Sequence, residues 1–291
     1  MKIALQRCCT TPVFLKQYES STNAILAKLG IEVVDIKEFG CCGYPLKNSS
    51  KKAYAACSAR NLSLAQERHL NLMTFCNCCY RTLKHVNVLM SEDAELRKDI
   101  NKTLGKEGLR YEGGVKVRHL MEVLYEDIGV KKIQKEIVST YKDLKIAVHY
   151  GCHVLRPREI NQFSDPGTRS IFDQLVALTG VETTAWQSQL ECCGSPMLGV
   201  DNELSMDLLE RKIADARLSG ADYLCVACPY CQLQFDRIQR MLISERKGNR
   251  PIPSILYTQL LGLALGIDRE TLGIGENELD ISGIMTHLTK P

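Results

Sequence analysis

The hexapeptide CCGYPL at residues 41–46 recurs as CCGSPM at residues 192–197, about half a chain further on. In each copy two adjacent cysteines precede a glycine, and a proline follows two positions later. Neighbouring residues on a regular strand point to opposite faces, so two adjacent cysteines address one site only if the chain turns there. Gly43 and Gly194 supply the permissive backbone for that turn, and the prolines fix the direction in which the chain leaves it.

The sequences on either side of the two hexapeptides also match. Upstream, AILAKLGIEVVDIKEFGCCG (24–43) lies against QLVALTGVETTAWQSQLECCG (174–194). Downstream, each copy leads into a helical stretch, 51–69 or 202–219, and then into a short strand that ends in C-x-x-C. Both halves therefore run strand, Cys, helix, strand, CCG, helix, strand, C-x-x-C, helix. This order predicts an α/β fold of two pseudo-repeated domains with mostly parallel sheets.

The repeat also predicts where the domains divide. Residues 1–142 form the first predicted domain, in which the charge-rich region 92–142 supplies connecting helices, and residues 143–291 form the second with a C-terminal tail. In open α/β sheets, ligands gather outside the carboxyl ends of the strands. Since the repeated cysteines follow predicted strands, we expect cysteine clusters at that edge of each sheet.

Composition narrows the class of protein. The chain has 291 residues, is 45% apolar and carries a formal charge of +3 without a dense basic block, so nucleic acid is not an expected partner. The N-terminus has too few consecutive apolar residues for a secretory signal, which predicts a cytoplasmic location. The most apolar stretch, 255–267, is short and interrupted, so we expect no direct membrane insertion.

The unusual count is 14 cysteines. A long chain without a secretory signal favours reduced thiols for metal or redox chemistry over a disulfide framework. Five cysteines repeat between the halves, with 31 and 33 intervening residues in the first set and 39 and 34 in the second. A structural zinc or a cubane iron–sulfur cluster takes four ligands, so a fifth repeated thiol indicates a larger or less regular centre. The two sets are Cys9, Cys41, Cys42, Cys76 and Cys79, and Cys152, Cys192, Cys193, Cys228 and Cys231.

One cysteine, a CC pair and a C-x-x-C at these spacings resemble the B subunit of heterodisulfide reductase and related CCG subunits. The stretches HYGCHVLRP (149–157), CPYCQLQFD (228–236) and YTQLLGLALG (257–266) are also typical of that family, and the resemblance covers nearly the whole chain. It implies that each set of five cysteines binds a noncubane 4Fe-4S cluster, in which a three-iron and a two-iron unit are fused. Two such clusters facing one substrate would explain why CCG occurs twice.

The resemblance implies an activity and partners. The family reduces a mixed disulfide, the heterodisulfide CoM-S-S-CoB, with electrons from a C-like subunit that bears cubane clusters and an A-like subunit that bears flavin. Disulfide cleavage takes two electrons, and each of two clusters can supply one. The alternative is a non-catalytic electron-transfer CCG subunit of another complex, in sulfur, aromatic-ring or hydroxy-acid metabolism. No GxGxxG follows a strand, so partners must bring the electrons.

Four further cysteines lack a repeated partner thiol. Cys8 aligns with Gly151, and Cys78 makes CNCC where the family usually has CNGC. Either residue is a small, soft filler of a glycine site, or it takes part in iron ligation or forms a redox-sensitive pair. Cys57 lies within a predicted helix and Cys225 within a predicted strand, which favours core positions for both.

Two histidines bracket Cys152. We expect His149 to be structural, and His153 is the candidate proton donor of the catalytic site. Arg156 and Arg158 are candidates for binding an anionic group of the substrate, because the guanidinium suits fork-like recognition of oxyanions.

Overall fold

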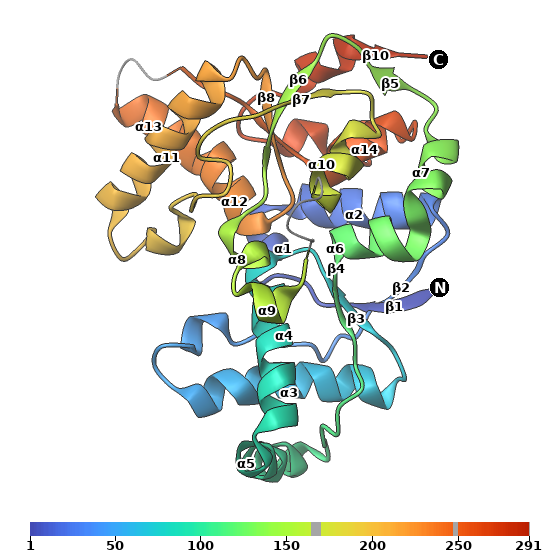
Figure 1. Ribbon diagram of the computed structural model, residues 1–291, viewed down its shortest axis with the longest axis vertical. Helices are drawn as coiled ribbons and strands as arrows, with labels where there is room; N and C mark the ends of the chain where they lie inside the picture. Colours follow the sequence, from blue (N-terminus) through green and yellow to red (C-terminus); the bar gives the residue numbers. More distant parts are fainter. Residues whose placement is uncertain (164–169, 247–249, 291) are drawn as a thin grey trace.

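The computed structural model describes residues 1–163, 170–246 and 250–290, and it contains two four-stranded parallel sheets (Figure 1). Both sheets have the same strand order when counted along the chain, with the second strand at one edge and the fourth at the other. This confirms the predicted α/β fold with repeated parallel sheets. The first sheet has the order β2-β1-β3-β4, formed by Glu32–Val34, Lys2–Leu5, Leu72–Thr74 and Val117–His119. The second has the order β7-β6-β8-β9, formed by Glu182–Thr184, Lys145–His149, Tyr223–Val226 and Ser254–Leu256.

Helices connect the strands of the first sheet and continue beyond its last strand. The 3-10 helices are η1 (Tyr44–Leu46) and η2 (Gly105–Glu107), and η3 (Val123–Gly129) is π-helical. The α-helices are α1 (Thr11–Phe14), α2 (Lys16–Lys28), α3 (Lys51–Glu67), α4 (Asn77–Glu92), α5 (Ala94–Leu104), α6 (Leu120–Glu122) and α7 (Val130–Glu136).

The second half repeats this arrangement with its own helices. Three segments are 3-10 helices, η4 (Ser195–Met197), η6 (Ile274–Glu276) and η7 (Ser282–His287), and η5 (Gln234–Ile238) is π-helical. The α-helices are α8 (Cys152–Leu155), α9 (Arg158–Asn161), α10 (Ile171–Ala177), α11 (Asn202–Leu218), α12 (Pro229–Leu233), α13 (Gln239–Glu245) and α14 (Tyr257–Ala264). Among the described residues, none of the helices is both long enough and apolar enough to cross a membrane.

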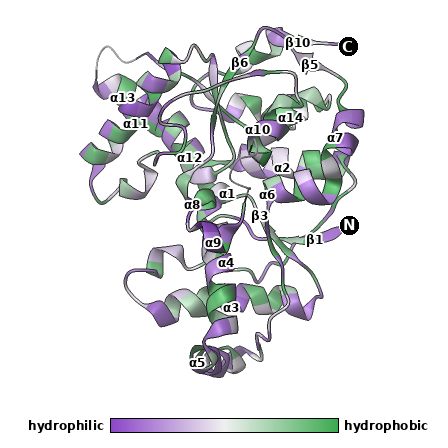
Figure 2. Cartoon of the chain, in the orientation of Figure 1, coloured by the Kyte–Doolittle hydropathy of each residue, from purple (hydrophilic) through white to green (hydrophobic). Residues whose placement is uncertain are grey.

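The helix that follows each CCG turn begins in the same way. The Ser50 side chain accepts a hydrogen bond from the amide of Ala53 at the start of α3, and the Asp201 side chain accepts one from Leu204 at the start of α11. Such caps satisfy amide groups that have no partner within the helix. Most outer helices carry both polar and apolar residues, as Figure 2 shows, because one face of each packs on a core.

The fourth strand of each sheet was not predicted. The region 92–142, predicted as connecting helices, contains α5 and α7 but also β4 and a short strand, β5 (Thr140–Tyr141). β5 pairs antiparallel with β10 (Leu288–Thr289) in the C-terminal tail. β4 and β9 escape prediction because each runs directly into a helix and leads to no repeated cysteine motif. The division after residue 142 stays a prediction.

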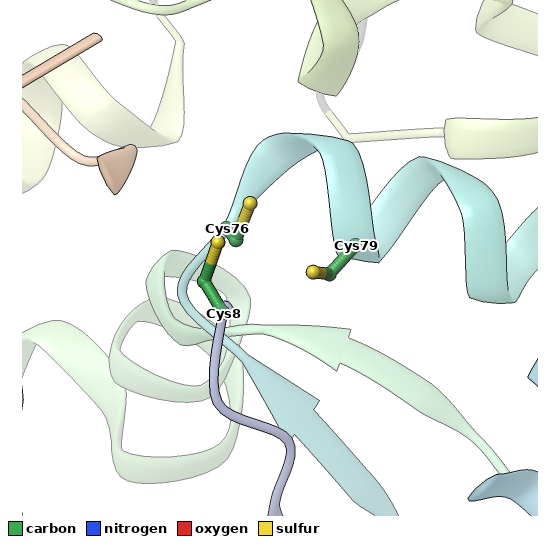
Figure 3. Close-up of side chains that lie close together, drawn as sticks. All are labelled: Cys8, Cys76 and Cys79. Atoms are coloured by element: carbon green, nitrogen blue, oxygen red, sulfur yellow. The ribbon is translucent and has the colours of Figure 1, made fainter. Parts of the chain in front are cut away.

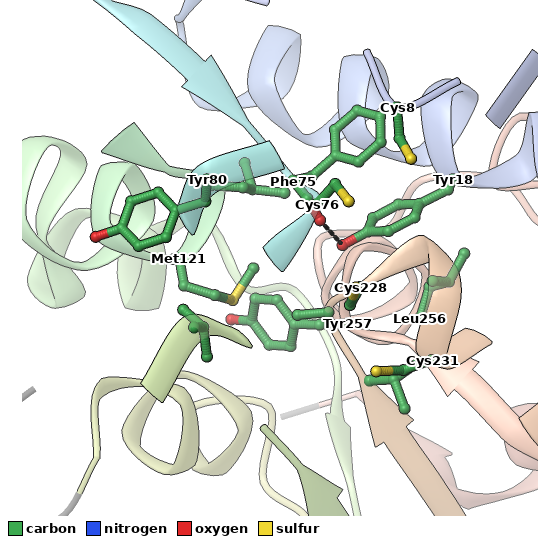
Figure 4. Close-up of a cluster of buried hydrophobic side chains, with 14 of the residues drawn as sticks. Cys8, Tyr18, Phe75, Cys76, Tyr80, Met121, Cys228, Cys231, Leu256 and Tyr257 are labelled. Carbon is green, nitrogen blue, oxygen red and sulfur yellow. Dashed lines mark hydrogen bonds between the residues drawn. The ribbon is translucent and has the colours of Figure 1, made fainter. Parts of the chain in front are cut away.

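The two halves share one apolar core. α14 packs against α2, and the hydroxyl groups of Ser21 and Thr258 lie 2.6 Å apart between these helices. Figure 4 shows part of this core, where Tyr18 of the first half lies near Tyr257 of the second. The Tyr18 hydroxyl donates to the carbonyl oxygen of Phe75 at 3.2 Å, just before the first C-x-x-C. The cysteines that follow β3 and β8 are therefore set into the same core that joins the halves.

Asn161 fixes the segment that follows Cys152. Its side-chain nitrogen lies within hydrogen-bonding distance of the carbonyl oxygens of His153 (2.7 Å), Val154 (3.1 Å) and Arg156 (3.1 Å). Its backbone carbonyl accepts hydrogen bonds from Tyr80 and Lys84 on α4, at 2.9 and 2.7 Å. One fully buried residue thus closes the α8–α9 turn and ties it to the first half.

We expect Asn161→Ala to lower the free energy of unfolding by about 2–3 kcal/mol, because buried carbonyl groups lose their donor. Urea unfolding under anaerobic, reducing conditions measures this change. Asn48→Ala, at an exposed position, is the matched control and should change stability by less than about 0.5 kcal/mol. Equal stability of the two variants would show that the Asn161 side chain does not hold the turn.

Candidate metal centre

The cysteines lie where the predicted sheet edge requires. Cys9 follows β1 and Cys152 follows β6, and each of these strands is central in its sheet. Cys76 and Cys228 are the N-terminal capping residues of α4 and α12. The backbone amide groups of Cys231 and Asn77 are directed at Cys228, which favours a negative charge on its sulfur. The predicted position of the cysteine clusters at the carboxyl edges of the strands is confirmed.

The CCG turns have the same geometry in both halves. Gly43 and Gly194 adopt φ values of 91° and 90°, a left-handed conformation that other residues rarely adopt. Their amide groups donate to Cys41 Sγ and Cys192 Sγ, each at 3.4 Å. A Cβ atom would lie 2.7 Å from the carbonyl oxygen of Tyr54 at Gly43 and 2.6 Å from that of Ser205 at Gly194. Both the conformation and the space therefore require glycine.

In the second half the five predicted thiols form a continuous series. Cys152 and Cys228 stand at its two ends. Neighbouring thiols shift one another's pKa values from Cys152 to Cys192 to Cys193, then to Cys231, and from Cys231 to Cys228. The Sγ atoms of Cys193 and Cys231 lie 3.7 Å apart. The structure thus brings all five residues of this set together.

The first half contains the same series with two more thiols, Cys8 and Cys78, both of which interact with Cys76. The contacts run from Cys9 to Cys41 to Cys42, then to Cys79 and Cys76. Cys8 joins the inner end of this series, since the sulfur atoms of Cys8, Cys76 and Cys79 all lie within 4.8 Å of one another (Figure 3). The sequence shows that Cys8 has no repeated partner thiol, but it does not predict where Cys8 lies.

The two series meet at their inner ends. The thiols of Cys76 and Cys228 lie close enough that each shifts the pKa of the other. The amide of the Asn77 side chain donates to the carbonyl oxygen of Tyr150 at 2.9 Å, beside the same junction. At the outer end, the Tyr230 hydroxyl lies 3.9 Å from Cys9 Sγ. The two cysteine sets therefore form one connected group across the boundary between the sheets.

Mutual contact changes the pKa values of these thiols. Burial raises the pKa of Cys76, and the hydrogen bond with Cys42 raises that of Cys79. Hydrogen bonds from Cys41 and Cys79 lower the pKa of Cys42 to about 4. Each thiolate in such a group disfavours the next one, so full ionisation requires a strong positive charge among the sulfur atoms.

His153 occupies a central position in this group. Its Nδ1 lies 3.6 Å from Cys152 Sγ and 3.7 Å from Cys78 Sγ, and its Nε2 lies 3.3 Å from the Tyr44 hydroxyl. Burial is the largest cause that lowers the pKa of His153, followed by the charge of Arg81. The Cys78 side chain therefore contacts His153, a residue of the second half.

His149 lies beside two thiols of the second set. It comes three residues before Cys152, but a ring nitrogen groups with the sulfur atoms of Cys193 and Cys231 within 4.8 Å. Burial lowers the pKa of His149 to about 3, so the imidazole is neutral near pH 7.

Two basic residues that were not predicted as site residues lie near His153. Arg156 and Arg158 are exposed, whereas Arg81 and Lys47 lower the pKa of His153 and therefore lie close to it. Arg81 comes two residues after Cys79 on α4, which is the one sequence signal that could have identified it. Lys47 follows η1 and gives no such signal.

The two remaining cysteines stand outside the thiol series. Cys225 is fully buried in β8, in accord with the predicted core position. Cys57 lies on α3 and is only partly buried, so it is less enclosed than predicted.

The chemistry of the donor set fits an iron–sulfur group. The connected atoms are soft thiol sulfurs, which favour iron–sulfur clusters, zinc or copper(I) over hard cations. Among the described residues, two groups have ligand atoms that all lie within 4.8 Å of one another: Cys8, Cys76 and Cys79, and His149, Cys193 and Cys231. The other thiols of each set continue the series outside these groups. Each series is therefore longer than the tetrahedral shell of a single zinc ion.

The fold and this thiol group define a protein with two cysteine-rich domains. The family model for the CCG cysteine-rich domain matches residues 3–84 and 146–236. The chain is 36% identical to the B subunit of the ferredoxin/F(420)H(2)-dependent CoB-CoM heterodisulfide reductase of Methanosarcina acetivorans, over 96% of this chain and 94% of that protein. It is 33% identical to an Archaeoglobus profundus protein described as similar to the B subunit of heterodisulfide reductase, over 87% and 86%.

Two further comparisons broaden this group. The 8-methylmenaquinol:fumarate reductase membrane anchor subunit of Wolinella succinogenes is 30% identical over 90% of this chain and 91% of its own. A crystal structure of a hypothetical protein from Helicobacter pylori matches with a TM-score of 0.78 and 17% identity over 97% of this chain. This chain spans about half (52%) of the Helicobacter chain, and that likeness shows the fold alone. The chain belongs to the CCG cysteine-rich domain family, in the group represented by the B subunit of heterodisulfide reductase.

Gly194→Ala tests the geometry of the CCG turn. The left-handed conformation costs about 1–2 kcal/mol for a residue with a Cβ, and the contact with Ser205 adds a further penalty of about 1–3 kcal/mol. Gly199→Ala is the matched control, because Gly199 has φ 84° but nothing within 4 Å of an added Cβ. We expect urea unfolding to show a clearly larger loss for Gly194→Ala. Equal losses would mean that the turn accommodates a Cβ.

Proposed function

We propose that this chain is an iron–sulfur subunit that reduces a small-molecule disulfide, CoM-S-S-CoB or a similar one, within a multi-subunit complex. The observation that carries the proposal is that the two thiol sets meet, with Cys76 beside Cys228 and Asn77 hydrogen-bonded to the Tyr150 carbonyl oxygen at 2.9 Å. We assign a noncubane 4Fe-4S cluster to each set. The proposed ligands are Cys9, Cys41, Cys42, Cys76 and Cys79 for the first cluster, and Cys152, Cys192, Cys193, Cys228 and Cys231 for the second.

Reduction of a disulfide consumes two electrons and two protons, breaks one S–S bond and forms two thiols. When bound, two iron–sulfur clusters supply the two electrons, one each. The chain's own residues hold the cluster sites at fixed positions, because the CCG turns and the two helix N-termini come from the same core. Partner proteins, one C-like with cubane clusters and one A-like with flavin, would deliver the electrons.

His153 and Tyr44 are the proposed source of a proton. The imidazole lies between Cys152 and Cys78 on one side and the Tyr44 hydroxyl on the other, so an N–H group can face the sulfur atoms while the hydroxyl holds the ring. Arg81 and Lys47 make this place electropositive, which supports a substrate that carries an anionic group.

A non-catalytic electron-transfer subunit is the second candidate. The observation in its favour is the identity with the Wolinella subunit, whose complex is named for methylmenaquinol and fumarate rather than a disulfide. Both candidates require partner subunits, and we propose the cytoplasm as the location in either case. Turnover of a panel of mixed disulfides by the complex, purified anaerobically with its partners, separates the two. Failure on every disulfide, with the clusters intact, would favour the electron-transfer role.

Metal content provides a direct test of the cluster assignment. Anaerobically purified chain should contain about eight irons and little zinc, as two four-iron clusters require. Elemental analysis together with acid-labile sulfide measures this. About two zinc ions with negligible iron would contradict the assignment.

Cys42→Ser and Cys193→Ser test whether both sites act on one substrate. Each variant should lose about half of the iron and nearly all disulfide reduction, while the other site keeps its spectrum. Cys57→Ala, on α3 outside the thiol series, is the control and should keep both iron and activity. Wild-type turnover in either serine variant would rule out joint action.

A further inference from the structure

The two halves differ at one position that faces the thiols. KIALQRCC (2–9) aligns with KIAVHYGC (145–152), which sets Cys8 opposite Gly151. A Cβ added to Gly151 would lie 3.4 Å from Cys231 Sγ and 2.2 Å from the side-chain nitrogen of Asn77. The position therefore points into the second thiol set, but Asn77 leaves no room there for a side chain.

In the first half this position does carry a side chain. Cys8 does not adopt the positive φ of Gly151, and its thiol is buried beside Cys76 and Cys79 (Figure 3). Cys79 is the repeat partner of Cys231, so the Cys8 sulfur occupies the place towards which the Gly151 position points. The Thr10 hydroxyl lies 3.2 Å from Cys8 Sγ, where it can donate to a thiolate.

Cys8 does not replace Cys9. The Cys9 thiol is exposed, contacts Cys41 and lies 3.9 Å from the Tyr230 hydroxyl, at the opposite end of the series from Cys76. The first site therefore has the Cys8 sulfur in addition to its five repeated thiols, and this sulfur lies at the inner end, close to both Cys76 and Cys79.

We propose that Cys8 is a sixth thiolate ligand of the first iron–sulfur site, in addition to Cys9. On ligation the Cys8 thiol releases its proton to solvent, and the sulfur forms a bond to iron. One more thiolate adds one negative charge, which stabilises the oxidised state and lowers the reduction potential of the first site relative to the second. This inference rests on the proposed iron–sulfur function and gives the two sites different electronic properties.

The test compares Cys8→Gly and Cys8→Ser with Cys57→Ala in the full chain bound to its partners. We expect Cys8→Gly to keep the iron content of the wild type, because five thiols remain. Its Mössbauer and EPR spectra should change at one site only, and a redox titration should show a higher potential for that site. Cys57→Ala should match the wild type in all three measurements.

Three results would overturn the inference. With iron present, wild-type spectra and potentials in Cys8→Gly would show that Cys8 is a filler of the glycine site. If Cys8→Gly loses all iron, Cys8→Ser decides, because a hydroxyl of similar size should retain iron with a shifted spectrum, and an unshifted spectrum excludes ligation. A wild-type chain without iron would overturn the proposed function and this ligand together.

Discussion

Crowded, mostly buried thiols are the constraint on which the rest of the structure depends. Twelve cysteines form one connected group, and the buried members are Cys8, Cys42, Cys76, Cys78, Cys79, Cys193, Cys228 and Cys231. An uncompensated thiolate is unstable in an apolar core, and adjacent thiolates repel one another. The group is therefore compatible with folding either as neutral thiols or with metal ions that supply positive charge. Its soft sulfur donors, and the number of these donors, favour several iron atoms over a single zinc ion.

The parallel sheets satisfy this constraint because they deliver cysteines from distant segments to one edge. Strand, turn and helix N-terminus each contribute a different cysteine, and the left-handed glycines let both members of a CC pair join the series. Duplication then supplies the second site without new geometry. What duplication alone does not supply is the junction, which depends on Cys76, Cys228 and the hydrogen bond from Asn77 to Tyr150.

The repeated order of elements and the places of the ten paired cysteines could be predicted because both rest on local pattern. The fourth strands could not, since Val117–His119 and Ser254–Leu256 run directly into helices and no repeated cysteine motif follows them. Contacts between residues that are far apart in the sequence could not be predicted either. Arg81 and Lys47 approach His153 only through tertiary packing, and His149 lies beside Cys193 rather than beside its sequence neighbour Cys152.

The same duplication shows where the two sites differ. The third residue of each C-x-x-C contacts the opposite half, but its side chain differs. The Cys78 thiol lies 3.7 Å from His153 Nδ1, and the Tyr230 hydroxyl lies 3.9 Å from Cys9 Sγ. Gln6 binds the Gly40 carbonyl at 2.8 Å where its repeat partner His149 faces sulfur. A mixed disulfide has two different sulfur atoms, so a site that handles both under the proposed function needs two unlike halves. At each of these equivalent positions the two halves place a different side chain near the thiols, although both sheets have the same strand order. The two sites therefore have unlike surroundings on equivalent backbones.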